Sequence, residues 1–173
     1  MGLRFENLDA ETRRLMVKEI ELDAGSTGFY LSNYLNDGGQ QRWPELLRRA
    51  AAEGDDDTLA ASLRGLFRGE VERRKPSGGY TMARVPVTAP ETLSQSQFNM
   101  YYMRALAIRA QTDGKTLTVY RARESANPRP GSEDMIGTPL DPDIVLEVLR
   151  RTKGVEPDIN IPMPNSGITV RLS

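Results

Sequence analysis

Residues Ser94–Arg123, SQSQFNMYYMRALAIRAQTDGKTLTVYRAR, place a helix pattern and a strand pattern on either side of one glycine. In the first part, apolar residues recur at helical spacing, Ser94 and Gln97 have the spacing of a capping box, and Gly114 ends the pattern. In Thr116–Arg123, apolar and polar residues alternate with period two, which is typical of a half-buried strand. The stretch therefore predicts a helix that begins near Ser94 and packs across the sheet to which the following strand belongs.

The central helix is expected to bury a stripe that contains Phe98, Tyr102, Leu106 and Ala105, because these residues follow the helical period. In an alternative interpretation, Tyr101 and Tyr102 form a stacking platform for a ligand or a base. Such platforms are usually presented on open strands, so the core interpretation is preferred.

Capping signals and apolar spacing predict four further helices. They cover residues 10–22 after Asp9, residues 44–53 with Pro44 at the first helical position, residues 55–67, and residues 142–151 after Asp141. The second and third helices, joined at Gly54, resemble an αα-hairpin. Asp55, Asp56 and Asp57 are interpreted as helix-start residues and not as a metal site, because consecutive residues do not share a helix face.

Three further strands are expected, at Phe29–Leu35, Tyr80–Val87 and Ile168–Leu172. A turn is predicted at residues 36–39, and Glu70–Gly79 has the composition of a flexible linker. Ala126–Pro130 cannot continue a ladder and is expected to be an extended loop.

These elements predict an α+β fold with an N-terminal helical region and a small mixed or antiparallel sheet that carries one central helix. The sheet would use residues 80–87, 115–123 and 168–172, and residues 29–35 could join it. One domain is expected over residues 1–173, which could divide into a helical subdomain, 1–75, and an α/β core, 80–173.

The composition excludes several classes of chemistry. The 173 residues include no cysteine and no histidine, which excludes disulfides, thiolate catalysis, zinc fingers and Ser-His-Asp triads. With 23 basic and 24 acidic residues the net charge is −1, so nucleic-acid binding would require a local patch. No apolar run is long enough to span a bilayer, and MGLRFENLD does not have the pattern of a signal peptide. We expect no cofactor, no membrane contact, and a cytoplasmic location, or a place in a virion if the chain derives from a phage.

Two groups of cations are candidates for anion or nucleic-acid binding. In the first, Arg73, Arg74 and Lys75 precede a glycine-containing segment and Tyr80, so they could follow a phosphate backbone while the ring stacks on a base. The alternative is a solvated helix end whose cations complement the helix dipole.

In the second group, Arg121 and Arg123 share one face of the predicted strand, and Arg129 lies in an exposed loop. The two strand arginines require a counter-ion, either a carboxylate such as Glu133 or Asp134 or an anionic ligand. The ion pair is the preferred interpretation.

Five segments, RFENLDAETRRLM, YTMARVPVTAPETL, FNMYYMRALAIRA, VYRARESANPRPGSEDMIG and PNSGITVRL, resemble a small family of uncharacterised bacterial proteins. The resemblance covers nearly the whole chain and implies a single evolutionary unit. It implies no catalytic residue and no ligand.

The leading hypothesis is therefore a non-catalytic interaction or structural subunit, for example of a phage particle or a mobile-element complex, with a protein partner or self-assembly. The first alternative is a nucleic-acid-binding module that uses the basic linker. The second is a carboxylate- or metal-dependent enzyme whose acid pair is assembled by the fold.

Overall fold

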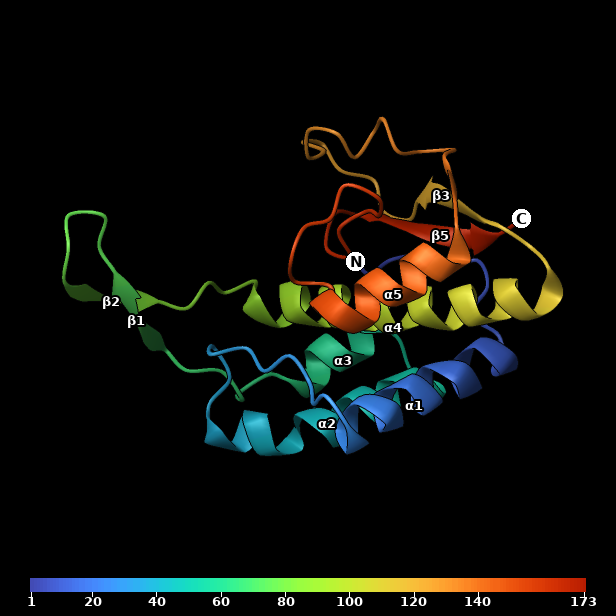
Figure 1. The fold of residues 1–173 in the computed structure, drawn as a ribbon. Coiled ribbons are helices and arrows are strands. Elements are labelled where there is room, and N and C mark those ends of the chain that lie inside the picture. The colour runs from blue at the N-terminus through green and yellow to red at the C-terminus, as the bar shows by residue number, and fades with distance from the viewer.

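The computed structural model describes residues 1–173 and contains five helices and two small antiparallel sheets. Along the chain, the elements are α1 (Ala10–Gly25), α2 (Asp37–Glu53), α3 (Asp56–Ser62), β1 (Glu70–Arg74), β2 (Tyr80–Arg84), α4 (Ala89–Asp113), β3 (Leu117–Arg121), β4 (Pro139–Leu140), α5 (Pro142–Thr152) and β5 (Ile168–Leu172). The predicted α+β class is confirmed: helices come first and are followed by a sheet that carries a central helix (Figure 1).

The long helix α4 lies in the middle of the molecule. In Figure 1, β3 and β5 lie above α4, α5 lies against it, and α1, α2 and α3 lie below. One cluster of 31 buried apolar residues extends through all of these elements. The core is thus built around α4, with a helical layer on one side and a small sheet on the other.

Helix α4 is buried on all sides along most of its length. Every residue from Leu93 to Ala107 is buried, so the buried surface of the helix is much wider than the predicted stripe. The four positions predicted to be buried are all confirmed. The ring of Phe5 adds to this contact, with its centroid 5.2 Å from that of Phe98 and 4.7 Å from that of Tyr102.

The predicted start of this helix is wrong. Helix α4 begins at Ala89, and Pro90 lies in its first turn. An N–H group at this position would have no acceptor within the helix, so the helix loses no hydrogen bond to proline. Ser94 and Gln97 are therefore not a capping box, because both are buried inside the helix. The predicted end is correct: Gly114 has a φ of 63°, in the left-handed region that closes many helices.

The main sheet has three antiparallel strands in the order β4-β3-β5. Val119 of β3 pairs with Val170 of β5, and both belong to the buried cluster. The strand predicted at residues 115–123 is confirmed with the shorter bounds Leu117–Arg121, and the strand predicted at residues 168–172 has the predicted bounds. The strand predicted at Tyr80–Val87 exists up to Arg84, but it belongs to the second sheet.

The second sheet is a hairpin of β1 and β2 only. The prediction of a linker over Glu70–Gly79 is therefore wrong, because residues 70–74 form a strand and residues 75–79 form its turn. The strand EVERR contains a single apolar residue, so it has no hydrophobic alternation by which it could be recognised.

Helix α2 also starts earlier than predicted. The side chain of Asn36 accepts a hydrogen bond from the Gly39 N–H at 2.8 Å and caps the helix, so the predicted turn is its first turn. Pro44 consequently lies inside α2 and not at its start. Helix α3 ends at Ser62, earlier than the predicted 67.

The strand predicted at Phe29–Leu35 is absent. Its residues form an irregular segment with a single bridge between Leu35 and Phe67. By contrast, α5 matches the predicted helix, and α1 begins as predicted but extends to Gly25, beyond the predicted end at residue 22. The side chains of Asp9 and Asp141 cap the two helices as expected.

We expect Leu106→Ala to lower the free energy of unfolding by about 2–5 kcal/mol, because it leaves a cavity at a fully buried position of α4. Denaturant unfolding followed by circular dichroism measures this change. Ile159→Ala, at a residue 97% exposed, is the control and should change the value by less than about 0.5 kcal/mol. If L106A unfolds at the wild-type midpoint, α4 is not the core helix.

Candidate functional site

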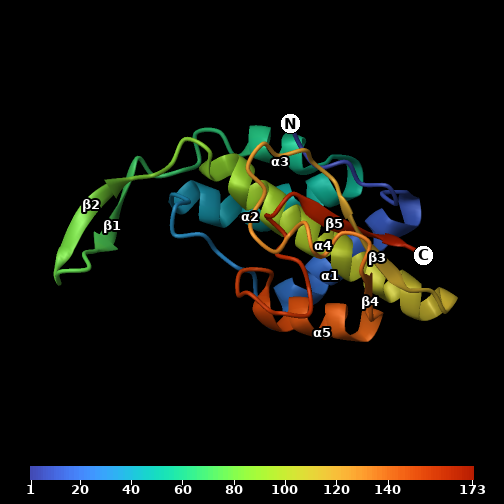
Figure 2. The same ribbon diagram turned by 90° about the horizontal axis from the view of Figure 1, so that it is seen from above.

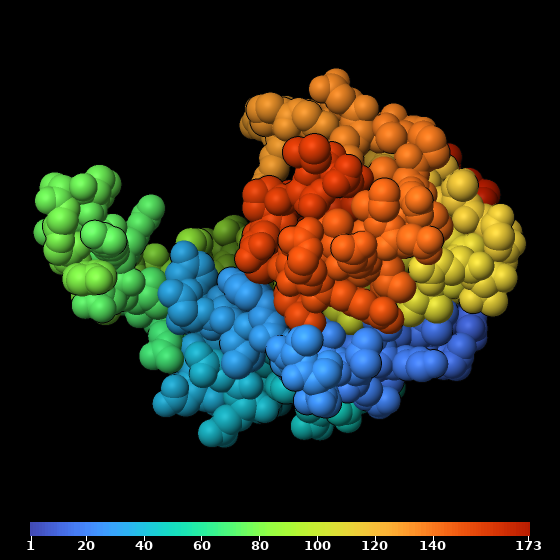
Figure 3. Space-filling view, in the orientation of Figure 1, coloured from blue at the N-terminus to red at the C-terminus, as the bar shows by residue number.

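The hairpin of residues 70–84, called the arm below, projects away from the rest of the molecule (Figures 1 and 2). None of its strand residues is buried; only Val71 and Ala83 are partly covered. The space-filling view shows the arm standing apart from the body, with a hollow between the two (Figure 3). The arm therefore has no core of its own and adds none to the body.

The backbone explains why this segment forms a hairpin. The register pairs Arg74 with Tyr80, and the turn is closed by a hydrogen bond from the Lys75 N–H to the Gly79 carbonyl at 2.9 Å. Gly78 and Gly79 have φ values of 92° and 75°, which a glycine adopts without strain. At the root, the Val85 N–H donates to the carbonyl of Gly69 at 2.9 Å, so the two ends of the arm leave the body side by side.

The arm presents apolar and cationic side chains to solvent. Tyr80 and Met82 are 64% and 58% exposed and lie on one face of the ribbon. Arg73, Arg74 and Lys75, next to the turn, form no salt bridge within the chain. Exposed apolar groups beside unpaired cations are typical of a contact surface.

The structure separates the predicted cations into two groups. Those of the arm lie on strand β1 and its turn, so the interpretation of a solvated helix end is wrong. Arg121, Arg123 and Arg129 lie on β3 and the loop after it, away from the arm in both ribbon views. The guanidinium of Arg121 pairs with Glu133, which confirms the predicted ion pair for this residue, whereas Arg123 forms no salt bridge. The candidates therefore do not form one continuous patch.

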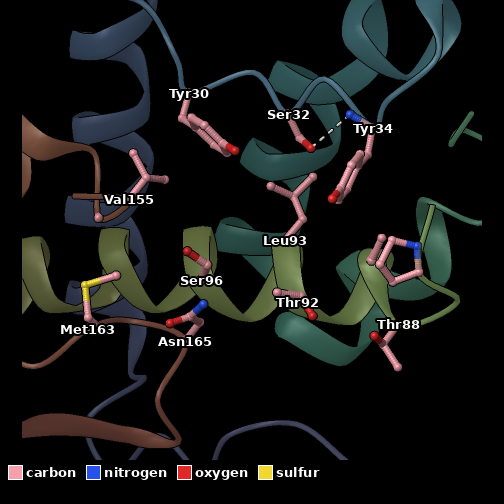
Figure 4. Close-up of a pocket in the computed structure, with 13 residues that line it drawn as sticks. Tyr30, Ser32, Tyr34, Thr88, Thr92, Leu93, Ser96, Val155, Met163 and Asn165 are labelled. Atoms are coloured by element: carbon pink, nitrogen blue, oxygen red, sulfur yellow. Dashed lines mark hydrogen bonds between the residues drawn. The ribbon is translucent and has the colours of Figure 1, made fainter. Parts of the chain in front are cut away.

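A pocket of about 320 Å³ lies where the arm joins the body. It is lined by Tyr30, Ser32 and Tyr34 from the segment before α2, by Pro86, Thr88, Ala89, Thr92, Leu93 and Ser96 at the start of α4, and by Gly154, Val155, Met163 and Asn165 after α5. In Figure 4 the two tyrosine rings extend towards α4 from one side, and Met163 and Asn165 lie on the other. Its volume is at the lower end of the range for ligand pockets.

No charged residue lines this pocket, called the neutral pocket below. Its hydroxyl groups form no side-chain hydrogen bond within the chain, except that Ser32 Oγ accepts from the Tyr34 N–H at 3.2 Å. The Oδ1 atom of Asn165 is buried and has no hydrogen-bond partner. The lining therefore combines apolar surface with free hydroxyl groups and no charge, so the site suits an uncharged occupant with apolar surface.

The strongest cluster of charges lies elsewhere and is structural. Arg104, buried on α4, donates to Glu19 at 2.8 Å and to Asp23 at 2.7 Å, both on α1. Arg150 donates to Glu19 at 2.6 Å, and Lys153 lies 2.9 Å from Asp23. Each carboxylate is thus held by two cations and covered by protein, which leaves it no contact with a substrate.

The pKa values of this cluster agree with that role. Burial raises the pKa of Glu19, but the hydrogen bond from Arg150 and the charge of Arg104 outweigh it and hold the pKa below its usual value. Burial likewise raises the pKa of Asp23, and the bonds from Arg104 and Tyr101 again lower it further than burial raises it. The stability that these ion pairs provide is present above the usual carboxylate range and is lost as the pH falls through the lowered values.

No group of three or more carboxylates could hold a metal ion. Of the three aspartates at the start of α3, Asp55 acts as predicted, because its side chain caps the helix. Asp56 and Asp57 accept hydrogen bonds from the N–H groups of Leu3 and Gly2 at 3.0 and 2.7 Å. They hold the first residues of the chain against the body.

The sequence interpretation missed the neutral pocket. Its lining comes from three segments far apart in the chain, and Tyr30 and Tyr34 were assigned to a strand. It also missed the arm, although the turn signal KPSGG lies between two strands that pair in register. That signal, a five-residue loop with two glycines, is the one that could have identified the hairpin.

Comparisons with protein-family models, with curated proteins and with solved structures gave no match. No helix is both long and apolar enough to cross a membrane. The arm and the neutral pocket are the two candidate functional features of the chain.

We expect stability to depend on pH through Asp56, because burial raises its pKa to about 6. Between about pH 4 and pH 6 the native state keeps a proton that the unfolded state releases, so the free energy of unfolding falls as the pH rises. Asp56→Asn keeps an acceptor for the Leu3 N–H but cannot ionise. Its stability should therefore rise relative to wild type across this window, by on the order of 2–3 kcal/mol at neutral pH.

Urea unfolding at a series of pH values measures this difference. Glu45→Gln, at an exposed position of α2, is the control and should follow wild type throughout. A difference between D56N and wild type that is constant from pH 4 to pH 7 would contradict the assignment.

Proposed function

We propose that the protein is a non-catalytic structural subunit that assembles with neighbouring subunits through its arm. The observation that carries this proposal is a two-stranded hairpin with no buried strand residue that projects from an otherwise well-packed body. An isolated two-stranded hairpin is at best marginally stable in water, so a surface that covers it is needed to hold it in place.

The edges of the arm support the same proposal. In a two-stranded sheet the outer side of each strand has unpaired N–H and C=O groups, which pair readily with another chain. Exposed Tyr80 and Met82, with Val87 at the root 93% exposed, supply the apolar area that such a contact buries. A phage particle or a mobile-element complex is the kind of assembly in which we expect this subunit, in a virion or in the cytoplasm.

A second candidate function is nucleic-acid binding by the same arm. Arg73, Arg74 and Lys75 precede Pro76 at the end of a two-stranded ribbon, and such a ribbon fits the major groove of DNA. A proline can also act as a wedge between base steps. This candidate ranks second because Glu70 and Glu72 lie on the same strand and the exposed Tyr80 and Met82 are apolar.

Replacement of residues 70–84 by Asn-Gly tests the first proposal, because Gly69 and Val85 are neighbours and a short turn can join them. We expect wild type to have a mass above that of the monomer in size-exclusion chromatography with light scattering. The shortened variant should be monomeric and melt as wild type does, since the arm adds nothing to the core. Ile159→Ala, at an exposed residue outside the arm, should assemble normally. A monomeric wild type at every concentration, or a shortened variant that still assembles, would disprove the proposal.

Replacement of Arg73, Arg74 and Lys75 by alanine tests the second candidate. If the arm binds duplex DNA, the variant should bind more weakly, and the slope of log affinity against log salt should fall by up to about three units, roughly one for each lost phosphate contact. Fluorescence anisotropy over a salt series measures both. The control removes the same charge from three exposed arginines of the body, Arg42, Arg48 and Arg64. Equal effects of the two triple variants, or none, would reject the arm as a DNA-binding element.

A further inference from the structure

We propose that the arm of one copy docks into the neutral pocket of a second copy, with Tyr80 and Met82 entering the pocket. This inference rests on the proposed function and names the surface that receives the arm. Three observations on the two surfaces support it: the reach of the arm, the chemistry of the pocket, and the charges around each.

The arm cannot fill the pocket of its own chain. Pro86 lines the pocket, and Tyr80 precedes it by six residues, about 20 Å of extended chain that leads away from the body. The arm and the pocket of one molecule are therefore both available to neighbours. A contact between two different surfaces of identical copies is head-to-tail, and it repeats as a closed ring or an open filament.

The chemistry of the pocket matches the apolar side of the arm. Leu93, Met163 and the two tyrosine rings provide apolar surface, and a volume of about 320 Å³ is of the size of one or two large side chains. The phenolic O–H of Tyr80, or an edge N–H of the arm, can pair with the free hydroxyl groups of the pocket lining. No cation lines the pocket, so its chemistry does not favour an anionic occupant.

The charges near the two surfaces are complementary. Glu91 and Glu156 are exposed, form no salt bridge, and directly adjoin the lining residues Thr92 and Val155. The unpaired cations of the arm lie next to its turn, close to Tyr80 in the ladder, whereas the carboxylates of Glu70 and Glu72 lie nearer its root. An apolar centre with opposite charges at its rim is the usual arrangement of a specific interface.

Cross-linking tests the proposal directly, because the chain has no cysteine. Tyr80→Cys, in which Met82 remains to dock the arm, and Thr92→Cys are prepared separately, mixed under mild oxidation and analysed by mass spectrometry. A disulfide forms only when the two Cα atoms come within about 7 Å, so we expect an 80–92 cross-link between copies. The control is Thr112→Cys, an exposed threonine at the other end of the same helix, which should not cross-link to position 80.

Obstruction of the pocket gives an independent measurement. Thr92→Trp places a large ring in the pocket at an exposed position, and it should convert the assembly to monomers without lowering the melting temperature. Thr112→Trp should assemble as wild type does. If T92W is unstable, the cross-linking result decides.

The outcomes separate the two proposals. If the variant without the arm is monomeric, yet positions 80 and 92 cross-link no more than 80 and 112 and T92W still assembles, then the arm binds elsewhere and this inference fails alone. If wild type is a monomer, both proposals fail. Cross-linking at 80–92 together with loss of assembly in T92W supports both.

Discussion

The rest of the structure depends on the enclosure of α4 between Leu93 and Ala107. A charged side chain on a helix segment without a solvent-facing side needs a partner of opposite charge inside the protein, since an unpaired buried charge costs several kcal/mol. Arg104 meets this condition through Glu19 and Asp23 on α1, and these carboxylates in turn bind Arg150 and Lys153 around the end of α5. One guanidinium thereby sets the relative positions of three helices.

The same condition explains the opposite side of α4. The Nδ2 atom of Asn99 donates to the carbonyls of Pro164 and Ile168 at 2.9 and 3.1 Å, and Thr169 donates to its Oδ1. This ties the sheet and the loop before it to the helix. Apolar packing holds the layers together, and these buried hydrogen bonds and ion pairs fix their register, because a shift of one layer would break them.

The sequence predicted those parts of the fold whose signals are local. Gly114 and Asp141 act on the residues beside them, so the corresponding helix ends were correct. Ser94 and Gln97 have the spacing of a cap but lie within a buried helix, which local spacing cannot reveal.

For the candidate site, the pair of Arg121 with Glu133 was predictable, since both residues lie near one strand. The neutral pocket was not, because its walls meet only through tertiary packing. The arm was predictable in part. The glycines of its turn can be recognised in the sequence, but a strand that packs on no other element has no apolar pattern.

The placement of the N-terminal residues has a consequence for the order in which the chain folds on the ribosome. The hydroxyl of Tyr120 donates to the Arg4 carbonyl and accepts from the Glu6 N–H, so these early residues have no partner until β3 has been synthesised. Glu19 on α1 likewise has no cation partner until Arg104, and then Arg150, have been synthesised. Because such contacts join distant parts of the sequence, the N-terminal helices cannot complete their packing while the chain is still short. The body can therefore complete its packing only when nearly the whole chain is available, and a ribosome-bound fragment that ends before α4 would expose the side of α1 that later receives it.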